Sequence, residues 1–244
     1  MGKTTTAVNL AVALAEAGNE VLLIDMDPQG NASTGVGIAP EQRAVNAFDM
    51  LMGESSVTET QVPTQVPGLS IVPASQDLAS LDHQLAGRND RLTLLKRALE
   101  RGPDRGFVII DCPPTLGVLT LNALIAADGL LAPLQSEFYA LEGLSHLLQT
   151  LKDVRKLNPK LRLEGIVLTM HDARNNLARQ VESDARQHLG EVVFPTVIPR
   201  NVRVSEAPSH GQSVLTYEPQ SRGSIAYRSL AAEYLARIDA RMTS

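Results

Sequence analysis

The sequence predicts an α/β fold in which helices flank both faces of a mostly parallel, doubly wound sheet. Three observations predict it: apolar runs recur along the 244 residues, helical patterns lie between several of them, and polar residues follow the runs directly. Uninterrupted apolar runs are typical of strands that are buried on both faces. We expect strands at residues 21–24, 69–72, 107–110, 130–134, 165–168 and 192–194.

The predicted helices combine helical spacing of apolar residues with strong helix formers. The first spans Ala7 to Ala15 and has a plausible stop at Gly18. Residues 35–67 are less regular, with three prolines and several glycines, and we expect a short helix there at 47–52. Further helices are expected at residues 91–101, 143–157, 176–189 and 224–241.

Composition is that of one soluble domain spanning residues 1–244. The chain is 43% hydrophobic and 20% charged, which allows a substantial core. Cys112 is the only cysteine, so an internal disulfide is excluded, and one thiol cannot supply the ligands of an iron–sulfur cluster. There is no apolar run of about 20 residues and no signal-peptide pattern, so we expect a cytoplasmic protein without stable membrane association.

Charge is distributed unevenly along the chain. The net charge of −5 argues against a uniformly basic surface for nucleic acid. Residues 151–222, however, contain eleven Lys or Arg and eight Asp or Glu. This excess permits a basic patch in the C-terminal half, although solvated helix faces give similar counts.

The first residues match the end of a phosphate-binding loop. Such a loop reads G-x-x-x-x-G-K-[ST], with backbone N–H groups facing the phosphates and the Lys reaching the β and γ oxygens. Gly2, Lys3 and Thr4 supply the closing G-K-T and lead into the first predicted helix, whose N-terminus favours phosphate. Alone the match is weak, because these residues are also ordinary at helix starts.

Two apolar runs end in aspartate. In an open parallel sheet the ligand crevice lies beyond the carboxyl ends of the strands, so polar residues there are candidates for chemistry. Asp25 closes one run and Asp27 follows in a turn, while Asp111 closes another. An acid at such a strand end can hold Mg²⁺, often through water, although turn formation and helix capping also favour aspartate. Cys112 fits a small buried filler better than a nucleophile.

Taken together, G-K-T-T, D-x-D-P-Q-G-N and I-I-D-C-P-P make the chain resemble the ParA/Soj chromosome- and plasmid-partition ATPases of the deviant Walker superfamily. The likeness continues through residues 135–144, 168–177 and 198–211 and so covers nearly the whole chain. It implies a P-loop NTPase-like fold, ATP and Mg²⁺ as cofactors, and ATP hydrolysis.

The resemblance also implies roles for individual residues. Lys3, Asp27 and Asp111 would form the catalytic group, with Asp27 positioning the attacking water and Asp111 as the Walker B acid. Thr4, Asp25 and Asp111 would surround the metal, Asp25 by supporting its shell. The phosphate ligands would be Gly2, Lys3, Thr4 and Thr5.

Two further groups come from the C-terminal half. Pro199, Arg200 and Asn201 fall where the family's adenine-side loop lies. Arg174 and Arg203 match positions that the family uses for non-specific DNA binding, although either could be an ordinary surface residue or a salt-bridge partner.

The implied function is a DNA-partition switch. ATP and Mg²⁺ would drive a homodimer that binds DNA without reading sequence, and a ParB-type centromere-binding protein would stimulate hydrolysis, giving a cytoplasmic, nucleoid-associated protein. The alternatives are a MinD-like membrane-associated regulator and a DNA- or partner-binding module without turnover. The mixed charge of residues 231–244 argues against the membrane helix that the first alternative needs.

The chain departs from the family pattern at its beginning. The family loop reads K-G-G-x-G-K-T-T after a strand at the middle of the sheet, and this chain lacks that strand, the signature Lys and both earlier glycines. We expect Met1 to mark a misplaced start, and we expect the two strands that flank the absent one to keep unpaired backbone groups and exposed apolar surface.

Overall fold

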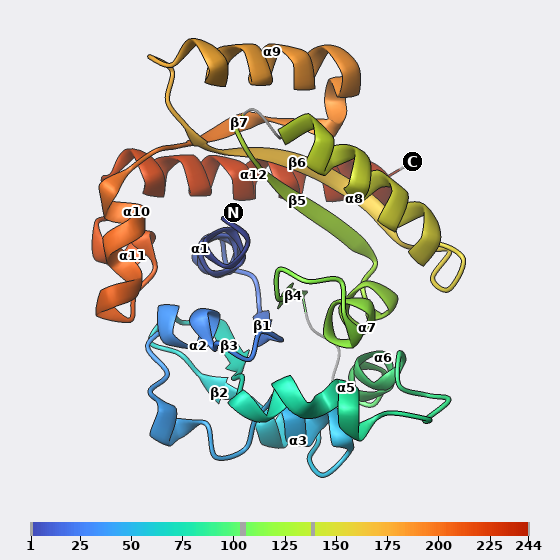
Figure 1. The fold of residues 1–244 in the computed structure, drawn as a ribbon. Coiled ribbons are helices and arrows are strands. Elements are labelled where there is room, and N and C mark those ends of the chain that lie inside the picture. The colour runs from blue at the N-terminus through green and yellow to red at the C-terminus, as the bar shows by residue number, and fades with distance from the viewer. Residues whose placement is uncertain (1, 103–105, 138–139, 244) are drawn as a thin grey trace.

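A computed structural model describes residues 2–102, 106–137 and 140–243, with the side chains of 140–146 and 242 left out (Figure 1). The strands are β1 (Val21–Asp25), β2 (Val62–Pro63), β3 (Leu69–Val72), β4 (Phe107–Asp111), β5 (Gly129–Gln135), β6 (Arg162–His171) and β7 (Val193–Pro199). The helices are α1 (Lys3–Glu16), α2 (Asn31–Gly35), α3 (Ala47–Met52), α4 (Val57–Thr60), α5 (Leu81–Gln84), α6 (Leu94–Glu100), α7 (Val118–Ala126), α8 (Ala140–Val154), α9 (Asn176–Leu189), α10 (Val202–Glu206), α11 (Val214–Tyr217) and α12 (Arg222–Met242).

The strands form two sheets, with the orders β2-β3-β1-β4 and β5-β6-β7. Neighbouring strands are parallel except β2 and β3, which are antiparallel. The α/β fold with mostly parallel strands is therefore confirmed. The register sets Asp25 opposite Asp111, so both aspartates lie at the same carboxyl edge.

Helices cover both faces of the strands, as a doubly wound fold requires (Figure 1). Along β1, Val21 and Leu23 belong to a core with α1, α11 and α12, whereas Leu22 and Ile24 belong to a core with α3, α5 and α6. Successive side chains of a strand point to opposite faces, so an uninterrupted apolar run buries both faces. A third core joins β5, β6 and β7 to α9.

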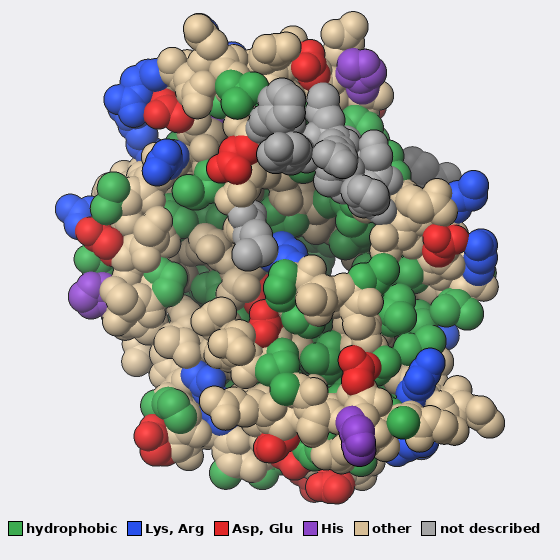
Figure 2. Space-filling view, viewed as in Figure 1, with side chains coloured by type: hydrophobic (Ala, Val, Ile, Leu, Met, Phe, Trp, Pro, Cys, Tyr) green, Lys and Arg blue, Asp and Glu red, His purple; other side chains and the backbone are tan. Residues whose placement is uncertain are grey.

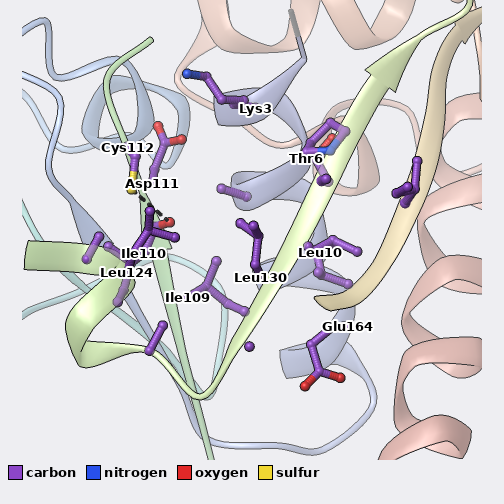
Figure 3. A pocket seen from close by; sticks show the side chains of 18 of the residues that line it. Lys3, Thr6, Leu10, Ile109, Ile110, Asp111, Cys112, Leu124, Leu130 and Glu164 are labelled. Atoms are coloured by element: carbon purple, nitrogen blue, oxygen red, sulfur yellow. Dashed lines mark hydrogen bonds between the residues drawn. The ribbon is translucent and has the colours of Figure 1, made fainter. Parts of the chain in front are cut away.

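A cavity separates the two sheets. It measures about 400 Å³ and is lined by β4, β5 and the inner side of α1. In Figure 3, Lys3 and Asp111 lie at one end of the cavity and Glu164 lies at the other. Val108 of β4 is 37% exposed, and most β5 residues are only half-buried, although both strands are in the middle of the molecule. The expected gap in the sheet thus lies between β4 and β5.

Most predicted elements are present, with shifted ends. The helices at 47–52 and 176–189 are confirmed residue for residue, and the first helix begins earlier, at Lys3. The helix predicted at 91–101 begins only at Leu94, because the Asn122 side chain of α7 accepts hydrogen bonds from the N–H groups of Leu94 and Leu95. The helix predicted at 143–157 spans Ala140–Val154, and β6 and β7 are longer than the runs that predicted them.

Candidate nucleotide-binding site

The carboxyl ends of β1 and β4 bring three aspartates to one edge of the sheet. Asp25 ends β1, Asp111 ends β4, and the backbone N–H of Met26 donates to the Asp111 carbonyl over 2.9 Å. Asp27 follows in the turn after β1 and is 7% exposed. The strand register therefore brings Asp25 and Asp111 together at this edge, and the role of the three carboxylates in nucleotide binding stays a prediction.

Asp25 is fully buried and holds the loop that follows it. One carboxylate oxygen accepts the N–H of Asp27 at 3.2 Å, and the other accepts the N–H and Oγ of Ser33 at 2.8 and 2.7 Å. Burial raises the pKa of Asp25, and the Ser33 and Asp27 hydrogen bonds oppose the rise. Both oxygens are thus engaged within the protein.

Asp111 is 2% exposed and is only partly engaged. The Thr4 side chain hydrogen-bonds this carboxyl group, but Asp111 Oδ2 has no hydrogen-bond partner among the described residues. Burial raises its pKa to about 7; the Thr4 hydrogen bond and the charge of Lys3 oppose the rise, while the charges of Asp25 and Asp27 add to it. A buried carboxylate oxygen without a donor is where a cation fits.

Asp27 is placed by its own turn. Its Oδ1 accepts the N–H of Gln29 at 3.0 Å, and its carbonyl accepts the N–H of Gly30 at 2.9 Å. Gly30 has φ +63°, a left-handed conformation that glycine adopts without strain. The turn chemistry considered as the alternative for Asp27 is therefore present and also holds its carboxylate at the site.

The N-terminus of α1 supplies the phosphate-facing groups. Gly2 has φ +93°, and a Cβ built there would lie 3.1 Å from Oγ1 of Thr169, so the position favours glycine. Lys3 Nζ donates to the Pro113 carbonyl at 2.9 Å, across from Asp111 (Figure 3). The N–H groups of Lys3, Thr4 and Thr5 belong to the first helical turn, where no intrahelical acceptor exists. Such a turn binds anions readily.

The predicted adenine-side residues lie at the carboxyl end of β7. Asn201 Oδ1 accepts the N–H of Arg203 at 2.8 Å and so caps α10. The N–H of Arg200 donates to the His171 carbonyl at 2.9 Å and extends the pairing of β6 with β7. Pro199 is half-buried at the end of β7. The structure thus gives Asn201 a capping role, and contact of these residues with adenine stays a prediction.

The two predicted DNA-binding residues lie near one another in the topology. Arg174 is in the loop between β6 and α9, and Arg203 is in α10, which follows β7. Their side chains are 92% and 51% exposed, and both form ion pairs with neighbouring carboxylates. The salt-bridge alternative therefore describes both residues in this structure, and their contact with DNA stays a prediction.

Sequence reasoning missed Ser33, whose hydroxyl joins Asp25 to the backbone of Ala74. Its only signal was its place one turn into the helix after the D-P-Q-G turn. Cys112 is half-buried, and burial raises the pKa of its thiol to about 12, which agrees with a filler. Within the described ranges, the His, Cys, Asp and Glu side chains form no group of three that could hold a metal by themselves.

Comparisons with known proteins agree with this geometry. A family model described as an AAA domain matches residues 1–163. The chromosome partitioning protein ParA of Caulobacter vibrioides is 52% identical over 241 residues, covering 97% of this chain and 90% of the relative. The chain belongs to the ParA/Soj family of partition ATPases. The sporulation initiation inhibitor protein Soj of Bacillus subtilis is 48% identical over 238 residues, covering 97% of this chain and 94% of that protein.

A solved structure supports the fold. The cobyrinic acid a,c-diamide synthase of Mycobacterium smegmatis, crystallised with ADP and magnesium, superposes with a TM-score of 0.81 at 38% identity, covering 95% of this chain and 87% of that one. The P-loop ATPase fold of this ParA/Soj family member is thereby confirmed.

Proposed function

We propose that this chain is a DNA-partition switch that binds and hydrolyses Mg-ATP. One observation carries the nucleotide part: the buried Asp111 carboxyl contacts Thr4 at the start of α1, beside Lys3, and one of its oxygens has no hydrogen-bond partner in the described part of the chain. A helix start for phosphate and a carboxylate for a cation are therefore adjacent. The family and the neighbour crystallised with ADP and magnesium support ATP and Mg²⁺ as the ligands.

The residues at this edge fit ATP and Mg²⁺. Backbone N–H groups of Gly2, Lys3, Thr4 and Thr5 would bind phosphate oxygens. The Thr4 hydroxyl and Asp111 would hold Mg²⁺, Asp111 losing its proton as the cation binds. Bound Mg²⁺ would neutralise charge on the phosphates during transfer to water.

Lys3 and the two other aspartates would complete the site. Lys3 Nζ would leave the Pro113 carbonyl for a phosphate oxygen, a stronger acceptor because it is charged. Asp27 would orient the attacking water from its turn beyond β1. Asp25 would support the metal shell indirectly, because its two oxygens are engaged by Ser33 and Asp27.

The partition part of the proposal concerns partners. ATP would favour a homodimer that binds DNA non-specifically through Arg174 and Arg203, and a ParB-type protein would stimulate hydrolysis and release. The support is the family membership and the exposure of both arginines at the carboxyl edge. Such a protein is cytoplasmic and associates with the nucleoid.

A membrane-associated role has less support. In the described residues, no helix is both long and apolar enough to cross a bilayer. The C-terminal helix α12 is committed to the core, where Tyr227, Leu230 and Ala231 are buried against α1 and its neighbours. An amphipathic anchor needs a free apolar face, which α12 uses for packing.

The experiment compares ATP turnover and DNA retention in matched variants. Asp27→Ala is expected to bind Mg-ATP but to lose at least about 100-fold in hydrolysis, the scale of a lost general base. Glu54→Ala changes an exposed acid elsewhere and serves as the control. Undiminished turnover of Asp27→Ala would reject its role, and absence of Mg-ATP binding by the wild type would reject the proposed function.

A double variant tests the DNA part. Arg174→Glu combined with Arg203→Glu is expected to abolish DNA binding, because phosphate contacts dominate non-specific affinity. ATP affinity measured in parallel reports whether the double variant remains folded. Retained DNA affinity would remove both arginines from the proposal.

A further inference from the structure

Four exposed arginines follow the carboxyl ends of β6 and β7: Arg174, Arg179, Arg200 and Arg203, together called the arginine edge. In Figure 2 blue side chains gather along the edge where Figure 1 places α10 and the start of α9, with red carboxylates beside them. The N–H of Arg200 donates to the carbonyl of His171, next to Asp172. Two loops from adjacent parallel strands thus present one row of cations.

Arg174 is fully paired with a carboxylate from its own loop. Its Nε donates to Oδ1 of Asp172 at 3.0 Å and its terminal nitrogen to Oδ2 at 2.9 Å, while its backbone N–H also donates to Oδ1 at 3.1 Å. The Arg174 hydrogen bonds lower the pKa of Asp172 to about 2, and the charge of Arg200 contributes to this shift. The Asp172 carboxylate is therefore ionised wherever the protein is folded near neutral pH.

Arg203 has the same kind of partner. Its guanidinium donates to Oε2 of Glu206 at 2.8 Å, one helical turn further along α10. Asn201 caps this helix and fixes the backbone of Arg203. Both arginines that the family resemblance assigns to DNA are thus neutralised locally before any ligand arrives.

Arg200 differs from these two. Its side chain is exposed and, among the described residues, has no carboxylate within ion-pair distance and no hydrogen bond. It acts on Asp172 only through the electrostatic field that helps to lower the pKa of that carboxyl group. Asp172 therefore binds the guanidinium of Arg174 and is near enough to Arg200 for the charge of that residue to affect its pKa.

We propose that Asp172 and Glu206 are built-in counter-ions that compete with nucleic-acid phosphates for Arg174 and Arg203, and that Arg200 contacts phosphate without breaking an ion pair. This inference rests on the proposed DNA binding. Exposed ion pairs are weak, so phosphate can displace these carboxylates. An arginine that already has a counter-ion releases fewer solution cations when it binds phosphate, which lowers both affinity and its dependence on salt.

The test measures affinity for non-specific duplex DNA over a range of salt, with ATP and Mg²⁺ present. Asp172→Asn keeps the oxygen that accepts the Arg174 N–H but removes the charge. We expect it to bind more tightly at low salt and to steepen the slope of log K against log salt by about 0.9, as for one added phosphate contact. When salt rises from about 50 to 200 mM, the variant should therefore lose about 3.5-fold more DNA affinity than the wild type loses.

The chain offers a matched control. Arg88 binds Asp90 with the same two-pronged geometry, at 3.0 and 2.9 Å, and Arg97 pairs with the same carboxylate. This group lies in and beside the loop before α6, on a different part of the molecule (Figure 1). Asp90→Asn makes the same change in net charge and is expected to leave the salt slope as in the wild type. If Asp172→Asn and Asp90→Asn change the DNA affinity and its salt slope equally, the change in net charge explains the result and the inference is overturned. An Asp172→Asn variant that binds DNA no more tightly than the wild type would also overturn it.

Arg200 is tested separately. Arg200→Ala is expected to lower the salt slope by about 0.9, and Arg200→Lys, which keeps the charge, is expected to retain it. An alanine variant that loses ATP affinity with an unchanged DNA salt slope would return Arg200 to the adenine side and overturn its role here. If the wild type and every variant fail to bind DNA, the proposed function falls together with this inference. If the wild type binds DNA but the variants do not change the affinity and the salt slope as expected, the inference alone is overturned.

Discussion

Replacing Asp111 by asparagine should stabilise the ligand-free protein at alkaline pH while removing the proposed Mg²⁺ ligand. The pKa of Asp111 is about 7 in the folded protein against 3.8 for an ordinary aspartate, chiefly because the carboxyl is buried. The folded protein therefore holds this proton more tightly than the unfolded chain. Well below pH 4 the Asp111 carboxyl does not lower the free energy of unfolding. The loss of stability grows as pH rises and reaches its full value above pH 7.

The size of the stabilisation by Asp111→Asn follows from the pKa shift of Asp111. A difference of roughly three pKa units, at about 1.36 kcal/mol each, corresponds to on the order of 4 kcal/mol at pH 8. Urea unfolding of the wild type and of Asp111→Asn, from about pH 5 to 8.5 without nucleotide, measures it. We expect the stability advantage of the variant to grow from pH 5 to 7 and then level off. An advantage that is absent at pH 8, or independent of pH, would refute the reasoning.

Asp25 provides the contrast within the same experiment. It lies opposite Asp111 in register and is also buried, but its oxygens accept three hydrogen bonds. Asparagine at position 25 would place an NH₂ group opposite the N–H of Asp27 or opposite the N–H and hydroxyl of Ser33. A buried donor left without an acceptor costs about 1 to 3 kcal/mol. We expect Asp25→Asn to destabilise the protein where Asp111→Asn stabilises it; stabilisation by both variants would contradict the contact analysis.

Three further predictions concern the surroundings of the site. Ser33→Ala removes the hydroxyl donor to Asp25 and the acceptor of the buried Ala74 N–H, and it should lower the free energy of unfolding by about 1 to 3 kcal/mol, measured in urea; an unchanged midpoint would count against this support of the loop. Gly2→Ala forces alanine into φ +93° beside Thr169 and should weaken Mg-ATP binding in a titration, a result that wild-type affinity would exclude. Val108→Lys places a charge on β4, the edge strand of its sheet within the described ranges, and should slow aggregation in light scattering, with stability changed by no more than about 0.5 kcal/mol; an aggregation rate equal to the wild type would show that this edge is not involved.

The sequence predicted the strands and the strand-end aspartates well, because apolar runs and their ends report burial directly. Asp25 and Asp111 closed their runs in the sequence and close β1 and β4 in the structure. The start of α6 was missed because its cap comes from Asn122, 28 residues away in the chain. Local patterns contain no signal for such a distant partner.

The contacts within the site required the structure. The strand-end pattern placed Asp25, Asp27 and Asp111 at one edge, and only the family resemblance gave them separate roles. The structure shows that Asp25 is engaged by Ser33, whereas one oxygen of Asp111, beside Thr4, has no hydrogen-bond partner among the residues that the structure describes. The ion pairs of Arg174 and Arg203 were an open alternative, since spacing of two or three residues from an acid permits a pair without requiring it.

The most direct measurement for the central claim is the affinity of this chain for non-specific duplex DNA with Mg-ATP and with Mg-ADP, at one salt concentration. A nucleotide-driven partition switch is expected to bind DNA with ATP and to lose that binding with ADP, and Lys3→Ala should abolish the difference. Equal DNA affinity in ATP, in ADP and without nucleotide would contradict the account.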